Sequence, residues 1–257
     1  MHDKPRIIAV CGKGGVGKTS ISALIVRELL QDPENKVLAV DADPAVGLAP
    51  ALGVSAGRTV DDVRNDLIRR VESGKAPGKA EMLAMLDYEM FCALEEKKNL
   101  AFLAIGRPEK EGCYCQVNHI LKDIIGSMAQ SFNFVVIDGE AGIEQVNRRV
   151  MENVTHLVLV SDSSARGLNV AKTIQAVSEN VISCEHACLV LNRVRGEEEL
   201  GSIRIPAEIP LLGWIPDDDV IRFADTAGNS LLDVSECAAT ETLRLCLKKI
   251  IRNPKQI

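Results

Sequence analysis

The sequence is poor in aromatic residues, in net positive charge and in long hydrophobic runs. Phe, Trp and Tyr together make up only 3% of the 257 residues. No apolar run reaches the roughly 18 to 20 residues of a membrane span, and MHDKPRIIAV contains no long apolar stretch with a cleavage site. The net charge of −6 leaves no basic excess to neutralise phosphates, which argues against a dominant role on nucleic acid. We expect a cytoplasmic protein without stable membrane association.

The composition and the pattern of apolar runs are typical of one α/β domain over residues 1–257. A composition of 46% hydrophobic and 26% charged residues is that of an ordinary globular protein. Short apolar runs alternate with helix-period segments, the pattern of a parallel sheet covered by helices. We therefore predict a doubly wound, mostly parallel sheet of about seven strands with helices on both faces. The expected strands are residues 6–11, 36–43, 100–106, 134–138, 156–162, 187–193 and 210–215.

Helices are expected in three informative places. Thr59 and Asp62 predict a capping box that opens a helix with Val63, Leu67 and Val71 on one face. A second helix is expected near 80–96. The C-terminal stretch LRLCLKKIIRN predicts an amphipathic helix that covers the sheet, with membrane binding as the alternative.

Eight cysteines are spread along the chain. Without a secretory signal, we expect reduced thiols rather than disulfides. Most of them are expected to pack as small hydrophobic side chains. These are Cys11, Cys92, Cys188, Cys237 and Cys246.

A phosphate-binding loop follows the first expected strand. The segment fits G-x-x-x-x-G-K-[ST] and leads into the helical pattern TSISALIVRELL. Backbone N–H groups of such a loop surround phosphate oxygens, Lys18 reaches the β- and γ-phosphates, and the Thr19 hydroxyl binds Mg²⁺. A glycine-rich turn formed by chance is the alternative. The nucleotide-binding candidates are Gly12, Lys13, Gly14, Gly15, Val16, Gly17, Lys18, Thr19 and Ser20.

Lys13 is the departure from an ordinary phosphate loop. GKGGVGKT resembles the deviant Walker A motif of the MinD and nitrogenase-iron-protein group of dimeric ATPases. The resemblance implies a P-loop ATPase fold and a homodimer around ATP, in which Lys13 reaches the nucleotide of the other subunit as an arginine finger does. An exposed loop lysine is the alternative.

The same resemblance assigns roles to three aspartates at strand ends. Asp41 and Asp43 in DADP match switch I, so Asp43 would orient the attacking water and Asp41 would lie near the metal. Asp138 in FVVIDGEAG matches the Walker B position. The candidate catalytic residues are Lys13, Lys18, Asp43 and Asp138, and the candidate Mg²⁺ residues are Thr19, Asp41, Asp43 and Asp138.

The base is expected to be adenine. The chain has Leu191-Asn192-Arg193 where a GTPase of this architecture would carry N-K-x-D, and an asparagine amide can donate to and accept from the adenine N6/N7 edge. By the resemblance, Pro216 and Asp217 form a loop beside the base, although turn formation alone would explain them. Asn192, Arg193, Pro216 and Asp217 therefore join the nucleotide-binding candidates.

The pair Cys113 and Cys115 predicts a shared metal site. In an extended segment the two sulfurs point to one side, and two thiolates leave a four-coordinate metal half satisfied. A two-fold dimer supplies the other two by symmetry. Soft thiolates favour Ni, Zn or Cu(I). Surface thiols or a redox pair are the alternative, and His119 could join the site.

GRP-x-x-x-GCYC, VVIDGEAG and DADP together resemble the CooC-type nickel-insertion ATPases of carbon monoxide dehydrogenase and the related AcsF-type proteins of acetyl-CoA synthase. The resemblance implies ATP, Mg²⁺ and Ni²⁺, with Zn²⁺ as a possible substitute, and one of these two enzymes as client. The residues Ala45-Val46-Gly47-Leu48 replace polar residues of the dehydrogenase-type members, which favours the acetyl-CoA synthase client.

Two rival functions stay open. An iron–sulfur electron-transfer reductase would also use four cysteines from two subunits, although DGEAGIEQ lacks the expected cysteine. A MinD-like spatial regulator would use the C-terminal helix on membranes. A second metal site at Cys184, His186 and Cys188 is disfavoured because Cys188 lies in an apolar strand pattern.

Overall fold

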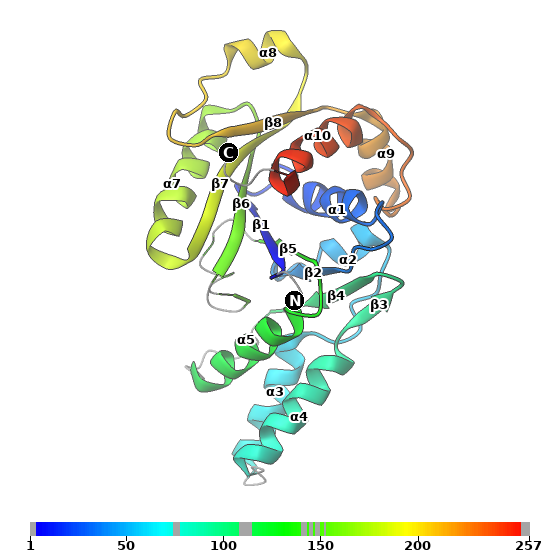
Figure 1. Ribbon diagram of the computed structural model, residues 1–257, viewed down its shortest axis with the longest axis vertical. Coiled ribbons are helices and arrows are strands. Elements are labelled where there is room, and N and C mark those ends of the chain that lie inside the picture. The colour runs from blue at the N-terminus through cyan, green and yellow to red at the C-terminus, as the bar shows by residue number, and fades with distance from the viewer. Residues whose placement is uncertain are drawn as a thin grey trace.

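An eight-stranded sheet forms the centre of the molecule in the computed structural model, which describes residues 4–73, 78–107, 115–139, 143, 146, 150, 151 and 153–252 (Figure 1). The strand order is β3-β4-β2-β5-β1-β6-β7-β8, and every neighbouring pair is parallel except β3 and β4. The strands are β1 (Arg6–Gly12), β2 (Val37–Asp41), β3 (Glu95–Lys97), β4 (Leu100–Ala104), β5 (Phe134–Asp138), β6 (Asn153–Ser161), β7 (Ser183–Val194) and β8 (Leu211–Pro216). The predicted doubly wound, mostly parallel class is confirmed.

The strand count differs from the prediction by one. The additional strand, β3, pairs antiparallel with β4 at the edge of the sheet, and its three residues are all exposed. Its sequence, Glu-Glu-Lys, contains no apolar residue and therefore did not predict a strand. Short charged strands are one way in which proteins protect a sheet edge. The second predicted helix, near 80–96, therefore ends earlier, at Cys92.

Helices cover both faces of the sheet, which gives two cores. Along β5, Val135 and Ile137 pack toward α3, α4, α5 and α7, whereas Val136 packs toward α1, α2, α9 and α10. Because both faces are covered, the central strands are fully buried and appear in the sequence as continuous apolar runs. The helices are α1 (Lys18–Leu29), α2 (Leu48–Leu52), α3 (Val60–Glu72), α4 (Lys79–Cys92), α5 (Cys115–Ala129), α7 (Ala165–Val181), α8 (Glu197–Ser202), α9 (Asp219–Ala227) and α10 (Ala238–Arg252).

The last helix, α10, packs against β8 and α1. Leu243, Leu247 and Ile250 are all buried in the core on that side of the sheet. The apolar stripe of the C-terminal segment is thus buried against the rest of the protein, as expected of a helix that covers the sheet. Within the described part of the chain, no helix has the length and apolar character needed to cross a bilayer.

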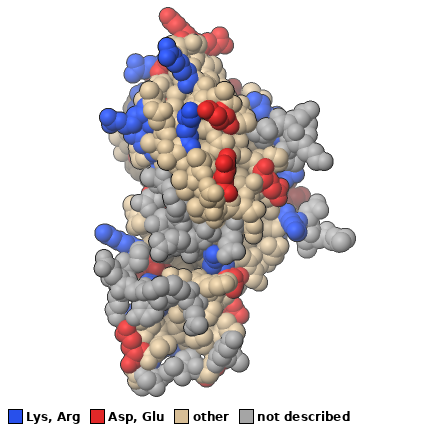
Figure 2. Space-filling view, turned by 90° about the vertical axis from the view of Figure 1, so that its left-hand side faces the viewer, with Lys and Arg blue, Asp and Glu red and all other residues tan. Residues whose placement is uncertain are grey.

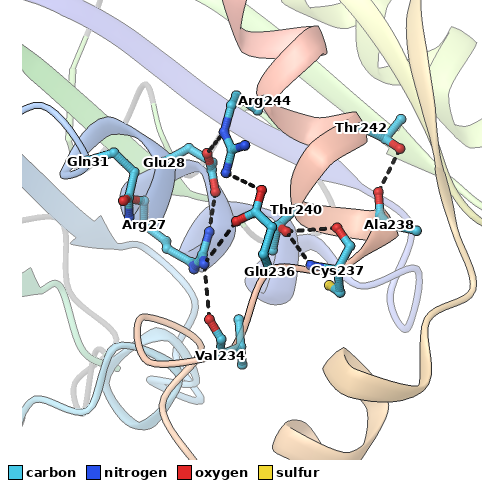
Figure 3. Close-up of polar contacts among 10 residues, drawn as sticks. All are labelled: Arg27, Glu28, Gln31, Val234, Glu236, Cys237, Ala238, Thr240, Thr242 and Arg244. Carbon is cyan, nitrogen blue, oxygen red and sulfur yellow. Dashed lines mark hydrogen bonds and ion pairs between the residues drawn. The ribbon is translucent and has the colours of Figure 1, made fainter.

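An ion-pair network joins α1 to α10 (Figure 3). The Glu28 side chain, only 3% exposed, accepts hydrogen bonds from Arg27 Nη1 and from Arg244 Nε, the latter at 2.7 Å. Glu236 pairs with both arginines, and Arg27 Nη2 donates to the carbonyl of Val234 at 3.0 Å. The helix that follows the phosphate loop is therefore tied to the C-terminal helix by charge as well as by packing.

Helices α3 and α4 extend the molecule beyond the sheet, at the lower end of both views (Figures 1 and 2). The predicted capping box is present, since the Thr59 side chain accepts from Asp62 N and the Asp62 carboxylate accepts from Thr59 N. Val63 and Leu67 are buried as expected, but Val71 in the last turn is 49% exposed.

The upper part of the face in Figure 2 carries both basic and acidic side chains.

Candidate nucleotide site

The phosphate loop occupies the turn between β1 and α1, at the carboxyl end of the parallel strands. β1 lies where the strand order reverses, with β5 on one side and β6 on the other, which is where open α/β sheets bind ligands. A Cβ at Gly12 would lie 2.1 Å from the carbonyl oxygen of Val160 on β6. Only glycine therefore allows the chain to turn this close to its neighbouring strand.

α1 begins at Lys18 without a side-chain cap, because its N-cap is Gly17 with φ 90°. The first N–H groups of such a helix are available to an anion, and the helix dipole favours negative charge there. Lys18 is buried and its Nζ lies 3.5 Å from the carbonyl oxygen of Lys13. Lys13 itself is half-buried. This arrangement is suited to binding phosphate.

Asp138, the last residue of β5, is held by two hydroxyl groups of α1. Thr19 Oγ1 donates to Oδ2 at 2.7 Å and Ser22 Oγ donates to Oδ1 at 3.0 Å. Asp138 is 1% exposed, and burial raises its pKa to about 6 against the opposing effect of both hydrogen bonds and of Lys18. Hydroxyl and carboxylate oxygens are the ligands that Mg²⁺ prefers, so Thr19 and Asp138 fit a magnesium ion held with phosphate oxygens.

Asp41, the last residue of β2, organises the loop that carries Asp43. Asp41 Oδ1 accepts from Asp43 N at 3.0 Å and Oδ2 accepts from Leu48 N at 2.8 Å. Burial is the largest cause that raises the pKa of Asp41 to about 7, and the nearby Asp138 carboxylate adds to it. Asp43 Oδ1 in turn accepts from Ala45 N at 2.9 Å. The described contacts of Asp41 are with backbone, and its contact with a metal stays a prediction.

A cavity of about 310 Å³ lies beside the phosphate loop. Its apolar wall includes Ile21 and Leu24 of α1, and its polar wall includes the predicted base-binding residues. The structure thus brings together Ser20, Asn192, Arg193, Pro216 and Asp217 around one cavity.

The Asn192 side chain has a partner that the sequence did not reveal. Its Nδ2 donates to the carbonyl oxygen of Val16 at 2.8 Å, and Arg193 Nη1 donates to that of Gly15 at 3.3 Å. The amide nitrogen of Asn192 is therefore engaged by the phosphate loop, which leaves its carbonyl oxygen for a base. An acceptor complements the 6-amino group of adenine rather than the 6-oxo group of guanine.

Comparison with known proteins identifies the family. Residues 7–231 match the model of the CobQ/CobB/MinD/ParA nucleotide-binding domain. The chain belongs to this family. Its members include the P-loop ATPases that the phosphate loop resembles, so the CobQ/CobB/MinD/ParA assignment agrees with the site described above.

Two relatives of this family member span nearly its whole length. An uncharacterised ATP-binding protein of Methanocaldococcus jannaschii is 38% identical over 233 residues, which cover 90% of this chain and 92% of that protein. The carbon monoxide dehydrogenase accessory protein CooC of Rhodospirillum rubrum is 32% identical over 238 residues, which cover 89% of this chain and 90% of that protein. Among solved structures, the septum site-determining protein MinD of Pyrococcus horikoshii, complexed with Mg-ADP, matches with a TM-score of 0.66 at 23% identity over 96% of both chains. That likeness concerns the fold alone.

The cysteine pair of this CobQ/CobB/MinD/ParA member is only partly placed. Cys113 lies outside the described residues, and Cys115 is the first residue of α5, with its side chain outside the description. β4 ends at Ala104, at the same edge of the sheet as the phosphate loop, and it is the last described strand before α5. His119 is 68% exposed and its Nδ1 lies 3.1 Å from Asp123 Oδ2. His119 thus faces solvent one turn into α5.

The other thiols make ordinary contacts. Cys188 is fully buried in β7, and burial raises its pKa to about 12, while Cys184 Sγ donates to the carbonyl of His186 at 3.1 Å. Cys11 and Cys246 are buried, Cys237 is half-buried, and Cys92 is exposed. In the part of the chain that the structure describes, no three His, Cys, Asp or Glu side chains are grouped so as to hold a metal ion.

Proposed function

We propose that this protein is an ATP-hydrolysing maturation factor that dimerises around ATP and carries nickel between two Cys113–Cys115 pairs. Its client would be acetyl-CoA synthase or carbon monoxide dehydrogenase. The observation that carries the ATPase part is the Thr19–Asp138 contact of 2.7 Å beneath a phosphate loop that contains Lys13. The nickel part is supported by the C-x-C pair and by the 32% identity to a carbon monoxide dehydrogenase accessory protein.

In the proposed mechanism each residue acts from the position described above. Mg²⁺, when bound with ATP, would neutralise charge on the phosphates. Thr19 and Asp138 would hold it, while Lys18 and the N-terminus of α1 bind the phosphates. Asp43, on the loop organised by Asp41, orients the attacking water, and Lys13 of each subunit stabilises charge on the nucleotide of the other. Hydrolysis would then separate the two C-x-C pairs and release the ion.

Anaerobic nickel binding tests the proposal. Calorimetry with light scattering should be run on the wild type and on Cys113→Ala/Cys115→Ala, each with and without ATP and Mg²⁺. We expect one nickel ion per dimer, altered by nucleotide and lost in the double variant. Cys92→Ala, which removes an exposed thiol on α4, is the matched control and should bind nickel as the wild type does.

The same experiment separates the rivals. Nickel binding that survives in the double variant, or is absent from the wild type, would refute the nickel function. A brown, visibly absorbing protein after anaerobic purification would favour an iron–sulfur reductase. ATP-dependent pelleting with liposomes would favour a MinD-like regulator, although the apolar face of α10 lies in the core.

A further inference from the structure

Ser22 is a fully buried residue of α1 that the proposed mechanism does not use. Its hydroxyl donates to Asp138 Oδ1 at 3.0 Å, from a helix to the end of a neighbouring strand. A serine inside a helix commonly bonds to the carbonyl four residues earlier or points to solvent. The described contact of the Ser22 hydroxyl is instead with a buried carboxylate.

Thr19 and Ser22 act on that carboxylate from the same face of α1. Residues three apart in a helix are neighbours on its surface, so both hydroxyls point toward β5. Thr19 Oγ1 reaches Oδ2 at 2.7 Å while Ser22 Oγ reaches Oδ1. Each carboxylate oxygen of Asp138 therefore has its own donor.

This double contact fixes a torsion that is otherwise soft. The terminal torsion of an aspartate side chain is broad and roughly two-fold, so the backbone of Asp138 alone does not orient the carboxylate plane. The Ser22 bond holds Oδ1, which leaves Oδ2 directed at Thr19. Burial would make loss of the donor costly, because Asp138 is only 1% exposed and water cannot easily replace the hydroxyl.

We propose that Ser22 is a positioning residue, which orients the Asp138 carboxylate so that Oδ2 and Thr19 Oγ1 together present a ready-made oxygen pair to the magnesium ion of the nucleotide. The inference rests on the proposed ATPase function and extends it to a residue outside the Walker motifs. Groups that orient metal ligands in this way typically change metal affinity by 10- to 100-fold when they are removed.

The test compares nucleotide binding with and without Mg²⁺, using a fluorescent ATP analogue. Ser22→Ala should raise the Mg²⁺ concentration for half-maximal stimulation of binding by about 10- to 100-fold. Binding in the presence of EDTA should stay within about two-fold of the wild type, because the phosphate loop is intact. Ser22→Thr retains the hydroxyl and should restore the wild-type Mg²⁺ dependence.

Ser178→Ala is the matched control. Ser178 is also buried in a helix, but its hydroxyl donates at 2.7 Å to the carbonyl of Gln175 in the same helix, α7. It should leave the Mg²⁺ dependence unchanged, and thermal unfolding of all variants will verify that each one is folded.

The possible outcomes separate the two proposals. Equal weakening with Mg²⁺ and with EDTA, or an unchanged Mg²⁺ dependence in Ser22→Ala, overturns the positioning role while the ATPase proposal stands. A wild type that binds nucleotide without any effect of Mg²⁺, or not at all, overturns both.

Discussion

Acid should weaken the fold through one buried histidine, His156 of β6. It is 2% exposed, its Nδ1 lies 2.9 Å from Thr155 Oγ1, and among the described residues its buried Nε2 has no hydrogen-bond partner. The ring of His186 on β7 lies 5.2 Å away between centroids. Burial, followed by the charges of His186 and Arg6, lowers the pKa of His156 to about 4.

The magnitude follows from linkage between protonation and folding. The unfolded chain binds this proton near a pKa of 6.5, whereas the folded chain binds it only near 4. Well above pH 6.5 the histidine is neutral in both states, and the folded state loses no stability. As the pH falls from 6.5 to about 4, only the unfolded state gains the proton, so the folded state loses stability. At roughly 1.4 kcal/mol per pH unit, the loss amounts to about 3 kcal/mol in full and about 2 to 3 kcal/mol by pH 4.5.

His156→Leu removes this titration at similar side-chain volume. Thr155 Oγ1 keeps its contacts with Ile7, accepting from Ile7 N at 2.9 Å and donating to Ile7 O at 2.8 Å. Urea unfolding of both proteins should be measured at several pH values between about 7.5 and 4.5. The stability of the wild type relative to the variant should fall by about 2 to 3 kcal/mol over this range.

The comparison also removes a competing effect. Burial raises the pKa of Asp41 to about 7 and that of Asp138 to about 6, so the folded state binds these protons first and gains stability as the pH falls. Both carboxylates are present in the two proteins and cancel in the difference. His119→Leu, at an exposed site, controls for the loss of a histidine. A wild-type-minus-variant difference that is constant within about 0.5 kcal/mol over the whole range would refute the reasoning.

Two further substitutions test the charge network and the base site. Glu28→Gln should lower the free energy of unfolding by about 2 kcal/mol, because buried Arg27 loses its nearest carboxylate while Glu236 still pairs with both arginines. Urea unfolding measures this, exposed Glu34→Gln is the control, and a loss below about 1 kcal/mol would contradict it. Asn192→Ala should reduce the preference for ATP over GTP about 10-fold in competition binding, because it removes the proposed acceptor for the adenine amino group. Exposed Asn229→Ala should keep the preference, and an unchanged ratio in Asn192→Ala would show that the base is read elsewhere.

The central sheet was predictable because parallel strands buried on both faces leave an uninterrupted apolar signal. β5 was predicted at residues 134–138, where it is observed, and the other six predicted strands appear in the same order. β3 gave no such signal, because its three charged residues face solvent at a sheet edge and are defined only by pairing with β4. For Val71 the prediction of burial was wrong. The helical period of apolar residues continues into the last turn of α3, where Val71 is 49% exposed.

Some parts of the site could also be predicted from the sequence and others could not. The phosphate loop from Gly12 to Thr19 was predictable because it is one continuous segment, whose geometry is set by residues adjacent in sequence. The contact of Ser22 with Asp138 joins residues 116 positions apart, and that of Asn192 with Val16 joins residues 176 apart. Neither has a local motif. The helical spacing of Thr19 and Ser22 was the one signal in the sequence that could have suggested the first.

The walls of the base cavity extend from Ser20 near the start of the chain to Ala239 in its last helix. During synthesis the ribosome would release the phosphate loop long before Ala239, so the cavity is incomplete until α10 has been added. With the base bound in this cavity, as proposed, ATP would stabilise chains that include α10 in preference to shorter ones. Under the proposed dimerisation around ATP, a chain that still lacks α10 could not be recruited into a dimer by its own nucleotide.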